Sequence, residues 1–158
     1  MNIFFLDSSP SQAAIYNVDS HVRKIILEAA QMLSSAYDSA PYRKTHVNHP
    51  MTRWCRESRG NFEWALAHGF ALCREFTYRF GKTHKTLEVF NWYQNNPPRI
   101  EKSEFTPPPQ CFGDYKDLCF TPNDPILGYR KYYNIAKKHL FAWKNREIPY
   151  FIKEYGTG

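Results

Sequence analysis

The sequence lacks long apolar runs. No segment approaches the roughly 18 consecutive apolar residues that a membrane-spanning helix needs. The first residues also contain no basic segment ahead of an apolar one, which is the pattern of a secretory signal. We therefore expect a soluble, cytoplasmic protein with no membrane partner.

Cysteine is scarce and its spacing is uninformative for metal binding. There are four cysteines and no CxxC pair, so no zinc-finger pattern is present. His46 and His49 lie three residues apart but have no thiolate or carboxylate at ligand spacing. The sequence therefore predicts free thiols, no metal and no cofactor. The cysteines are Cys55, Cys73, Cys111 and Cys119.

Acidic residues are fewer than basic ones, and aromatic residues are abundant. There are 15 Asp and Glu against 21 Lys and Arg, which gives a formal net charge of +6, and 17% of the residues are aromatic. Such a composition suits nucleic acid, because phosphates attract cations and bases stack on exposed rings. It also suits an aromatic core under a basic surface, and composition alone favours this second interpretation.

The length of 158 residues predicts one domain spanning residues 1–158. Apolar residues recur at helical spacing in three long stretches, and no run alternates as a strand does. We therefore expect an all-α, single-domain helical bundle of three main helices. These helices are expected at residues 20–36, 61–80 and 126–144.

The remaining segments are expected to be short helices or extended chain. Residues 1–6 (MNIFFL) are predicted to form an extended N-terminal arm on the core. Ser9 and Pro10 predict a short helix over residues 10–17, and Pro50 predicts another. Residues 95–123 contain a triple proline and predict a long Pro-rich surface loop.

One helix carries a line of polar residues beside its apolar face. Within the 20–36 helix, which Asp19 is expected to cap, His21, Lys24, Glu28 and Gln31 fall on one stripe. An acid or base, an amine, a carboxylate and an amide in one line can form an active site. Alternatively, Lys24 and Glu28 form an ordinary i,i+4 salt bridge on a solvent-exposed helix surface. The pattern itself leaves both interpretations open.

Two further clusters combine basic, aromatic and amide side chains. Their residues can contact phosphates or bases, but they also fit helix capping and a buried helix face. The first cluster contains Asn48, His49, Arg53 and Trp54. The second contains Tyr129, Arg130, Lys131 and Tyr132.

Three segments in this order resemble the pyrimidine-dimer DNA glycosylase/AP lyase superfamily, whose phage members are known as endonuclease V. The segments are DSHVRKIILEAAQ, RGNFEWALAHGFALCREFTYRFGK and GYRKYYNIAKK. The family pattern is an Asp-x-His helix start, a glutamate seven residues after the histidine, an Arg-x-Gly helix end and an aromatic Tyr-Lys-Tyr-Tyr segment. Asp19, His21, Glu28 and residues 79–81 and 129–133 match it. The whole chain also resembles small proteins of tailed bacteriophages.

The resemblance implies a DNA glycosylase of all-α fold that flips a damaged or modified base out of duplex DNA. In the family, an amine attacks the sugar and an AP-lyase step can follow. Glu28 is then the catalytic carboxylate and His21 orients the sugar or phosphate. Arg23, Arg53 and Arg130 are the implied phosphate contacts.

The sequence departs from the family at the nucleophile. The family uses an N-terminal threonine exposed by removal of methionine, whereas Asn2 follows Met1 here and favours retention of the methionine. The amine is therefore expected to be that of Met1 or Lys24, unless Glu28 activates water instead. Gln31 lies where the family has an arginine that contacts DNA.

The leading hypothesis is a monomeric DNA glycosylase in the cytoplasm, or in the host cytoplasm if a phage encodes it. A second hypothesis is a non-catalytic basic nucleic-acid-binding phage protein. A third is a hydrolase of the N-glycosidic bond of free nucleosides or nucleotides. A fourth is a phage protein that blocks a host factor through residues 95–123.

Overall fold

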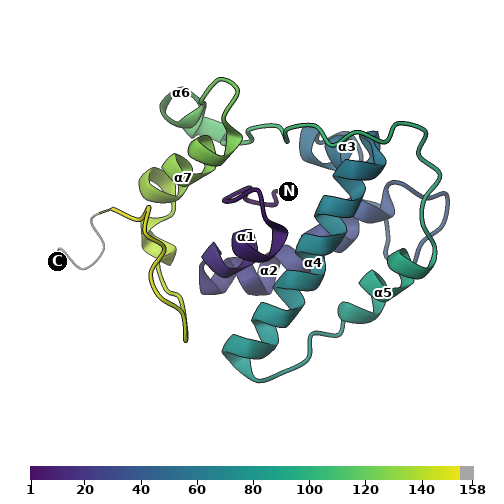
Figure 1. Ribbon diagram of the computed structural model, residues 1–158, viewed down its shortest axis with the longest axis horizontal. Helices are drawn as coiled ribbons and strands as arrows, with labels where there is room; N and C mark the ends of the chain where they lie inside the picture. Colours follow the sequence, from purple (N-terminus) through teal and green to yellow (C-terminus); the bar gives the residue numbers. More distant parts are fainter. Residues whose placement is uncertain (154–158) are drawn as a thin grey trace.

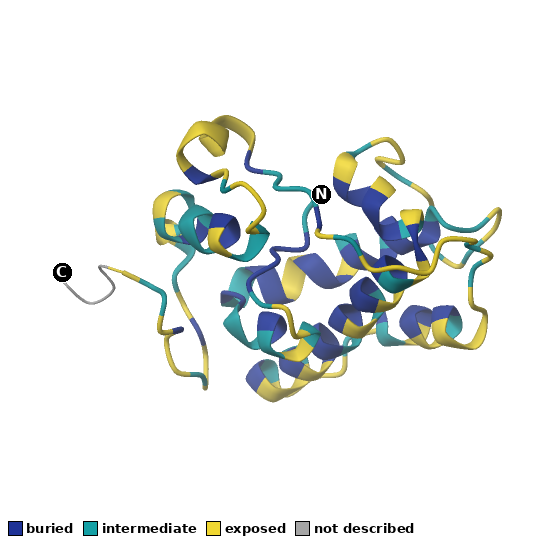
Figure 2. Ribbon diagram, turned by 45° about the horizontal axis from the view of Figure 1, so that its top comes forward, coloured by how far each residue is buried: buried dark blue, intermediate teal, exposed yellow. Residues whose placement is uncertain are grey.

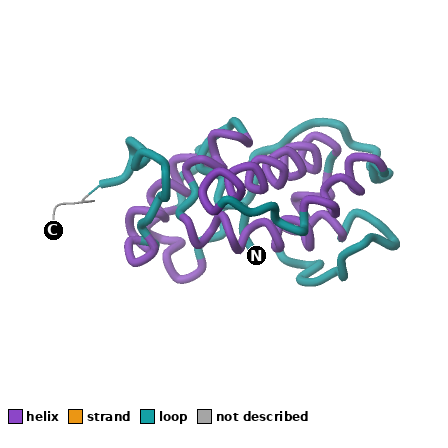
Figure 3. Tube along the Cα trace, turned by 90° about the horizontal axis from the view of Figure 1, so that it is seen from below, coloured by secondary structure: helices purple, strands orange, loops and turns teal. Residues whose placement is uncertain are grey.

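The computed structural model describes residues 1–153, and these contain helices and loops without a strand, which confirms the all-α fold (Figure 3). The long helix α4 (Arg59–Phe80) crosses the middle of the molecule (Figure 1). Within residues 1–153, every helix is too short or too polar to cross a membrane. The elements that pack on α4 are α1 (Pro10–Tyr16), α2 (Asp19–Ser34), α3 (Pro50–Glu57) and α5 (Leu87–Asn95). The remaining helices are α6 (Lys116–Cys119), α7 (Pro125–Ala136) and two 3-10 turns, Gly113–Tyr115 and Lys138–Leu140.

Several helix ends follow from their capping residues. The Ser9 hydroxyl accepts a hydrogen bond from the Gln12 N–H at 3.2 Å and begins α1. The Nδ1 of His49 accepts from the Met51 N–H at 3.1 Å and begins α3. Gly81 ends α4 with a φ of 68°, a left-handed conformation that glycine adopts at little cost. These boundaries agree with the sequence-based prediction.

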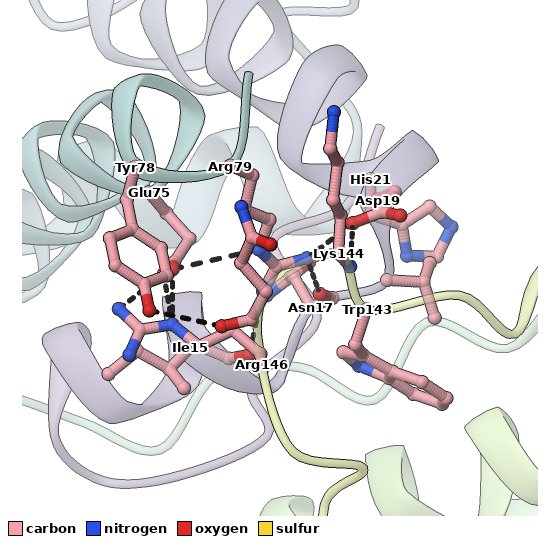
Figure 4. A network of polar contacts seen from close by, with 12 residues as sticks. Ile15, Asn17, Asp19, His21, Glu75, Tyr78, Arg79, Trp143, Lys144 and Arg146 are labelled. Carbon is pink, nitrogen blue, oxygen red and sulfur yellow. Dashed lines mark hydrogen bonds and ion pairs between the residues drawn. The ribbon is translucent and has the colours of Figure 1, made fainter. Parts of the chain in front are cut away.

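The predicted cap of α2 is wrong. Val18 holds the cap position without a side-chain hydrogen bond. The Asp19 carboxylate instead accepts hydrogen bonds from the Arg79 Nη1 at 3.0 Å and from the Lys144 N–H at 2.9 Å (Figure 4). Asp19 therefore joins the start of α2 to α4 and to the C-terminal segment.

The predicted helix over residues 126–144 is too long. Helix α7 ends at Ala136, because Lys137 adopts a φ of −116° that no longer continues the helix. The chain then turns back along α7, where the Asn134 amide donates to the Phe151 carbonyl at 2.9 Å and accepts from the Lys153 N–H at 2.7 Å. The C-terminal segment is therefore held by α7 instead of extending it (Figure 1).

The N-terminal arm lies on the core, as predicted, and its residues 3–6 are buried (Figure 2). It is not extended throughout, because the chain turns at Phe4, where φ is 47° and the Leu6 N–H donates to the Phe4 carbonyl at 2.8 Å. The ring of Phe4 stacks on the His21 imidazole of α2 with centroids 4.1 Å apart. The Leu6 carbonyl accepts a hydrogen bond from the Arg130 Nε of α7 at 3.0 Å. The arm therefore connects α2 with α7.

The Pro-rich loop is fastened to the helical core at Thr106. The Thr106 N–H donates to the Asn61 side-chain oxygen at 2.8 Å, and the Asn61 amide donates to the Thr106 hydroxyl at 2.9 Å. The loop passes from α5 over α3 towards α6 (Figure 1). Its far end brings Cys111 and Gly113 to the cavity described below.

Candidate active site

A cavity of about 290 Å³ lies where the N-terminal arm, α2, the start of α3 and the end of α7 meet. Its walls combine three amines, one carboxylate, two imidazoles and two aromatic rings. The lining residues are Met1, Asn2, Phe4, His21, Lys24, Ile25, Glu28, His49, Cys111, Gly113, Tyr132 and Lys137.

All four residues predicted to be catalytic line this cavity: Met1, His21, Lys24 and Glu28. The Met1 amino group lies 3.4 Å from the Glu28 Oε1, and the Glu28 side chain is only 17% exposed. Partial burial strengthens this ion pair relative to one in open water, because fewer water molecules screen it. The expected convergence of His21 and Glu28 from one helix face is confirmed.

Asn2 fixes the position of the Met1 amine. Its side-chain oxygen accepts hydrogen bonds from the N–H groups of Ile3 at 2.8 Å and Phe4 at 3.0 Å. Its amide nitrogen donates to the Cys111 carbonyl at 3.0 Å. These three bonds tie the arm to itself and to the Pro-rich loop, so the amine is held beside Glu28.

His21 is a neutral imidazole at physiological pH. Burial, together with the smaller effect of the nearby positive charges of Lys137, Lys24 and His139, lowers its pKa to about 3. The ring lies between Phe4 and the buried Tyr133, whose hydroxyl is 2.8 Å from the His21 Nδ1. His21 therefore contributes a hydrogen-bonding group to the cavity and no charge.

Tyr133 determines which ring nitrogen of His21 carries the proton. The Tyr133 oxygen accepts from the Val18 N–H at 3.3 Å, so its own proton is free to be donated. The His21 Nδ1 is the nearer acceptor at 2.8 Å, compared with 3.4 Å for the Asn17 side-chain oxygen. We assign the His21 proton to Nε2, which makes this nitrogen a donor.

We expect the Tyr133→Phe substitution to destabilise the protein by about 1–3 kcal/mol, because it leaves the Val18 N–H and the His21 Nδ1 buried without a partner. Urea denaturation measures this loss. The ¹⁵N chemical shifts of the His21 ring report its tautomer, which should become a mixture. Tyr115→Phe, at an exposed tyrosine, is the matched control. An unchanged His21 tautomer in the Tyr133 variant would show that Tyr133 does not set it.

Lys137 also lines the cavity, although the sequence did not predict it as a site residue. Its Nζ lies 5.0 Å from the centroid of the Tyr132 ring and 5.8 Å from that of Phe4. Burial lowers the pKa of Lys137, and the charge of Lys24 lowers it further. The only signal in the sequence was that Lys137 lies in a basic and aromatic segment. The predicted helix was continuous through Lys137, so the turn that brings this residue to the cavity was not expected.

Two of the residues predicted to bind nucleic acid also line the cavity, His49 and Tyr132. Burial lowers the pKa of His49, with a smaller contribution from the charge of the Met1 amine. The Tyr132 ring is half-buried and nearly parallel to Phe4, with centroids 6.2 Å apart. Each residue therefore has one side towards the protein core and one towards the cavity.

Trp54 and Tyr129 are core residues, which corrects their assignment as base-stacking side chains. Trp54 is 3% exposed, and its indole N–H donates to the Thr106 carbonyl at 2.8 Å. Tyr129 is fully buried, and its hydroxyl donates to the Pro109 carbonyl at 2.8 Å. Rings enclosed in this way have no face left for a base.

The other predicted nucleic-acid contacts lie outside the cavity and stay predictions. The Arg130 Nη2 donates to the Asp7 carboxylate at 3.3 Å, and its Nη1 donates to the Tyr150 hydroxyl at 2.7 Å. The Lys131 Nζ donates to the Thr121 hydroxyl at 3.1 Å.

Four further residues predicted to bind nucleic acid are at least partly exposed: Arg23, Gln31, Asn48 and Arg53. Arg23 covers the Phe80 ring at 4.1 Å, and the Arg53 Nη2 is 3.5 Å from the Asn48 side-chain oxygen.

No group of three or more histidine, cysteine, aspartate or glutamate side chains is arranged to hold a metal ion within residues 1–153. All four cysteines are free, and three of them are buried. The fourth, Cys111, lines the cavity, and burial raises the pKa of its thiol. The polar groups that the cavity offers include three amines, a carboxylate and two imidazoles.

Comparisons of the chain with protein-family models, with curated protein sequences and with solved structures found no match.

Proposed function

We propose that the protein is a DNA N-glycosylase that removes a damaged or modified base, with Glu28 as its catalytic carboxylate. The observation that carries the proposal is the 3.4 Å contact between the Met1 amino group and the Glu28 Oε1 inside a cavity. An amine and a carboxylate in contact are the two groups that amine-catalysed cleavage of an N-glycosidic bond requires.

The proposed reaction is a displacement at the sugar. The amine, as its free base, forms a bond to C1′ while the C1′–N bond to the base breaks, and the electron pair leaves with the base. The base takes up a proton from solvent, and the attacking amine loses one. Glu28 stabilises the positive charge that develops on the sugar ring. Opening of the sugar then gives a Schiff base at C1′, from which β-elimination can cleave the strand.

The geometry favours Met1 over Lys24 as the amine. The ion pair that helical spacing allows between Lys24 and Glu28 is not formed among the described residues, whereas the Met1 amine contacts Glu28 directly. The three hydrogen bonds of Asn2 hold Met1 in this place. A fixed amine loses little entropy when it attacks, which is a large part of the advantage of an enzyme.

DNA is the proposed partner because the surface beside the cavity is basic. The chain carries a net charge of +6. Lys24 of α2 is exposed and lines the cavity, and Arg53 is exposed on α3, whose capping residue His49 lines the cavity. Cations around the mouth of a cavity attract the phosphates on either side of an extruded nucleotide.

The size of the cavity favours a second candidate, a hydrolase of free nucleosides or nucleotides. A volume of about 290 Å³ lies at the lower end of the range of ligand pockets and suits one nucleoside unit. This candidate uses the same Glu28, with water in place of the amine. It differs in its substrate, because it acts on mononucleotides without a duplex.

The experiment that tests the proposal is trapping with borohydride, which reduces a Schiff base to a stable amine. Labelled duplexes that carry an abasic site, a thymine dimer or uracil are incubated with the protein in the presence of borohydride. We expect release of a base and a covalent protein–DNA adduct, with the adduct mapping to Met1. An adduct at Lys24 would transfer the amine role to that residue. Salt-sensitive binding without base release or adduct would contradict the proposal, and turnover of mononucleotides alone would support the hydrolase.

A further inference from the structure

Two lysines from opposite ends of the chain meet at the cavity. Lys24 lies on α2, and Lys137 follows the last residue of α7. Both line the same cavity as the His21 imidazole. The two elements are brought together by the N-terminal arm, which packs against both through Phe4.

Neither lysine has an acidic partner among residues 1–153. The only carboxylate in the cavity wall is Glu28, and its ion pair is with the Met1 amine. Lys137 instead lies near the aromatic rings of Tyr132 and Phe4. Two ammonium groups that face one cavity without a counter-charge repel each other, and the lowered pKa of Lys137 reflects burial together with this repulsion. An anion bound between them would remove the repulsion.

We propose that Lys24, Lys137 and His21 form a phosphate-binding subsite within the cavity. The two ammonium groups supply charge, and the neutral imidazole supplies an N–H donor at Nε2. The inference deepens the proposed function, and rests on it in naming a nucleotide phosphate as the bound group. The binding of phosphate itself does not require catalysis.

The donor set favours a phosphate over a carboxylate. A carboxylate is planar and is best matched by the flat fork of an arginine, whereas lysines bind as point charges that approach from independent directions. Here the donors come from two separate helical elements. Oxygen atoms arranged as a tetrahedron can accept from all of them at once.

The subsite also restricts the substrate class. A nucleoside without phosphate would supply no negative charge for the two ammonium groups that line the cavity, so it would bind poorly. A nucleotide or a DNA strand would place one phosphate between the lysines and the adjacent sugar towards Glu28 and the Met1 amine. By binding the phosphate, the subsite would fix the position of the reacting C1′ relative to Glu28 and the Met1 amine.

The test is a titration with inorganic phosphate, followed by the amide shifts of the ¹⁵N-labelled protein at constant ionic strength set by sodium chloride. We expect saturable shifts at cavity residues such as Gly113. Lys24→Met and Lys137→Met should each weaken binding about tenfold, because each removes one charge-assisted hydrogen bond. Lys137→Arg should retain most of the affinity. Lys82→Met removes an exposed charge that does not line the cavity and is the matched control.

Shifts that are absent, or that are equal in wild type, Lys24→Met and Lys137→Met, would overturn the subsite. Methionine keeps the length of the lysine stem, and unchanged spectra outside the cavity would show that each variant is folded. Two competitors identify the source of the phosphate: a nucleoside 5′-monophosphate and a short duplex with an abasic site. Displacement by the duplex supports a strand phosphate, and displacement by the monophosphate alone supports a free nucleotide.

The subsite and the proposed glycosylase can fail separately. Phosphate binding that depends on both lysines, without base release from any duplex, would keep the subsite and reject the glycosylase. Base release with phosphate affinity that neither lysine affects would keep the glycosylase and reject the subsite.

Discussion

Glu28→Gln is expected to reduce base release by about two to four orders of magnitude, the range that a single catalytic carboxylate contributes. Glutamine has nearly the same shape but carries no charge, so it cannot stabilise a cationic sugar or accept the proton of the attacking amine. It also ends the ion pair with the Met1 amino group, now 3.4 Å from the Glu28 Oε1. Single-turnover release of the base from a lesion-containing duplex measures the effect.

DNA affinity should change little or increase in this variant, because a negative charge near the phosphates is removed. Glu88→Gln, at an exposed glutamate of α5, removes the same charge away from the cavity and should leave base release unchanged. Full activity of Glu28→Gln would show that the carboxylate is not catalytic. Equal thermal unfolding of the two variants would show that a loss of activity is chemical.

Arg79→Met is expected to lower the free energy of unfolding by about 3–5 kcal/mol, the cost of removing one partner from a buried charged network. The Arg79 side chain is fully buried. Its Nη1 donates to the Asn17 carbonyl at 2.7 Å, and its Nη2 donates to the Ile15 carbonyl at 2.8 Å (Figure 4). Without the guanidinium these carbonyls lose their donors, and Asp19 loses its ion pair at 3.0 Å. Urea denaturation measures the change.

Arg74→Met is the matched control, because Arg74 lies on the same helix but is exposed, and its replacement should cost less than about 0.5 kcal/mol. The Glu75 Oε1 lies 3.6 Å from the Arg79 Nε and 2.7 Å from the Arg146 Nε, so Glu75 keeps a partner when Arg79 is replaced. The expected loss therefore comes from Asp19 and from the carbonyls of Ile15 and Asn17 at the end of α1. A loss as small as that of the control would mean that the network contributes nothing to stability.

The part of the site that follows from local rules was predictable from the sequence. His21 and Glu28 are separated by seven residues, which is close to two helical turns, so a regular helix places them on one face. The caps at Ser9 and His49 are likewise local, since each side chain bonds to an N–H two or three residues away. The burial of the arm followed from a short apolar segment ahead of the first cap, whereas its turn at Phe4 was not predicted.

The rest depended on contacts between distant segments, on which periodicity carries no information. Lys137 reaches the cavity because α7 ends at Ala136 and packs on the arm. Trp54 and Tyr129 are buried because carbonyls of the Pro-rich loop, at Thr106 and Pro109, accept their polar hydrogens. An aromatic residue with one polar group suits both a core and a base-stacking surface, so its type alone does not distinguish them.

The arm that closes the cavity has a consequence for how the protein is made. Its residues are synthesised well before some of their partners: Cys111 for Asn2, and Arg130 for Leu6. Phe4 and Phe5 contact the early His21 and Trp64, but the tyrosines of α7 that also cover Phe4 are synthesised much later. The apolar side chains of the arm therefore stay partly uncovered until α7 has been made. Closing so long a loop is slow compared with helix formation. The nascent chain thus carries a hydrophobic segment that a chaperone can bind, and the cavity is completed only after Lys137 has been synthesised.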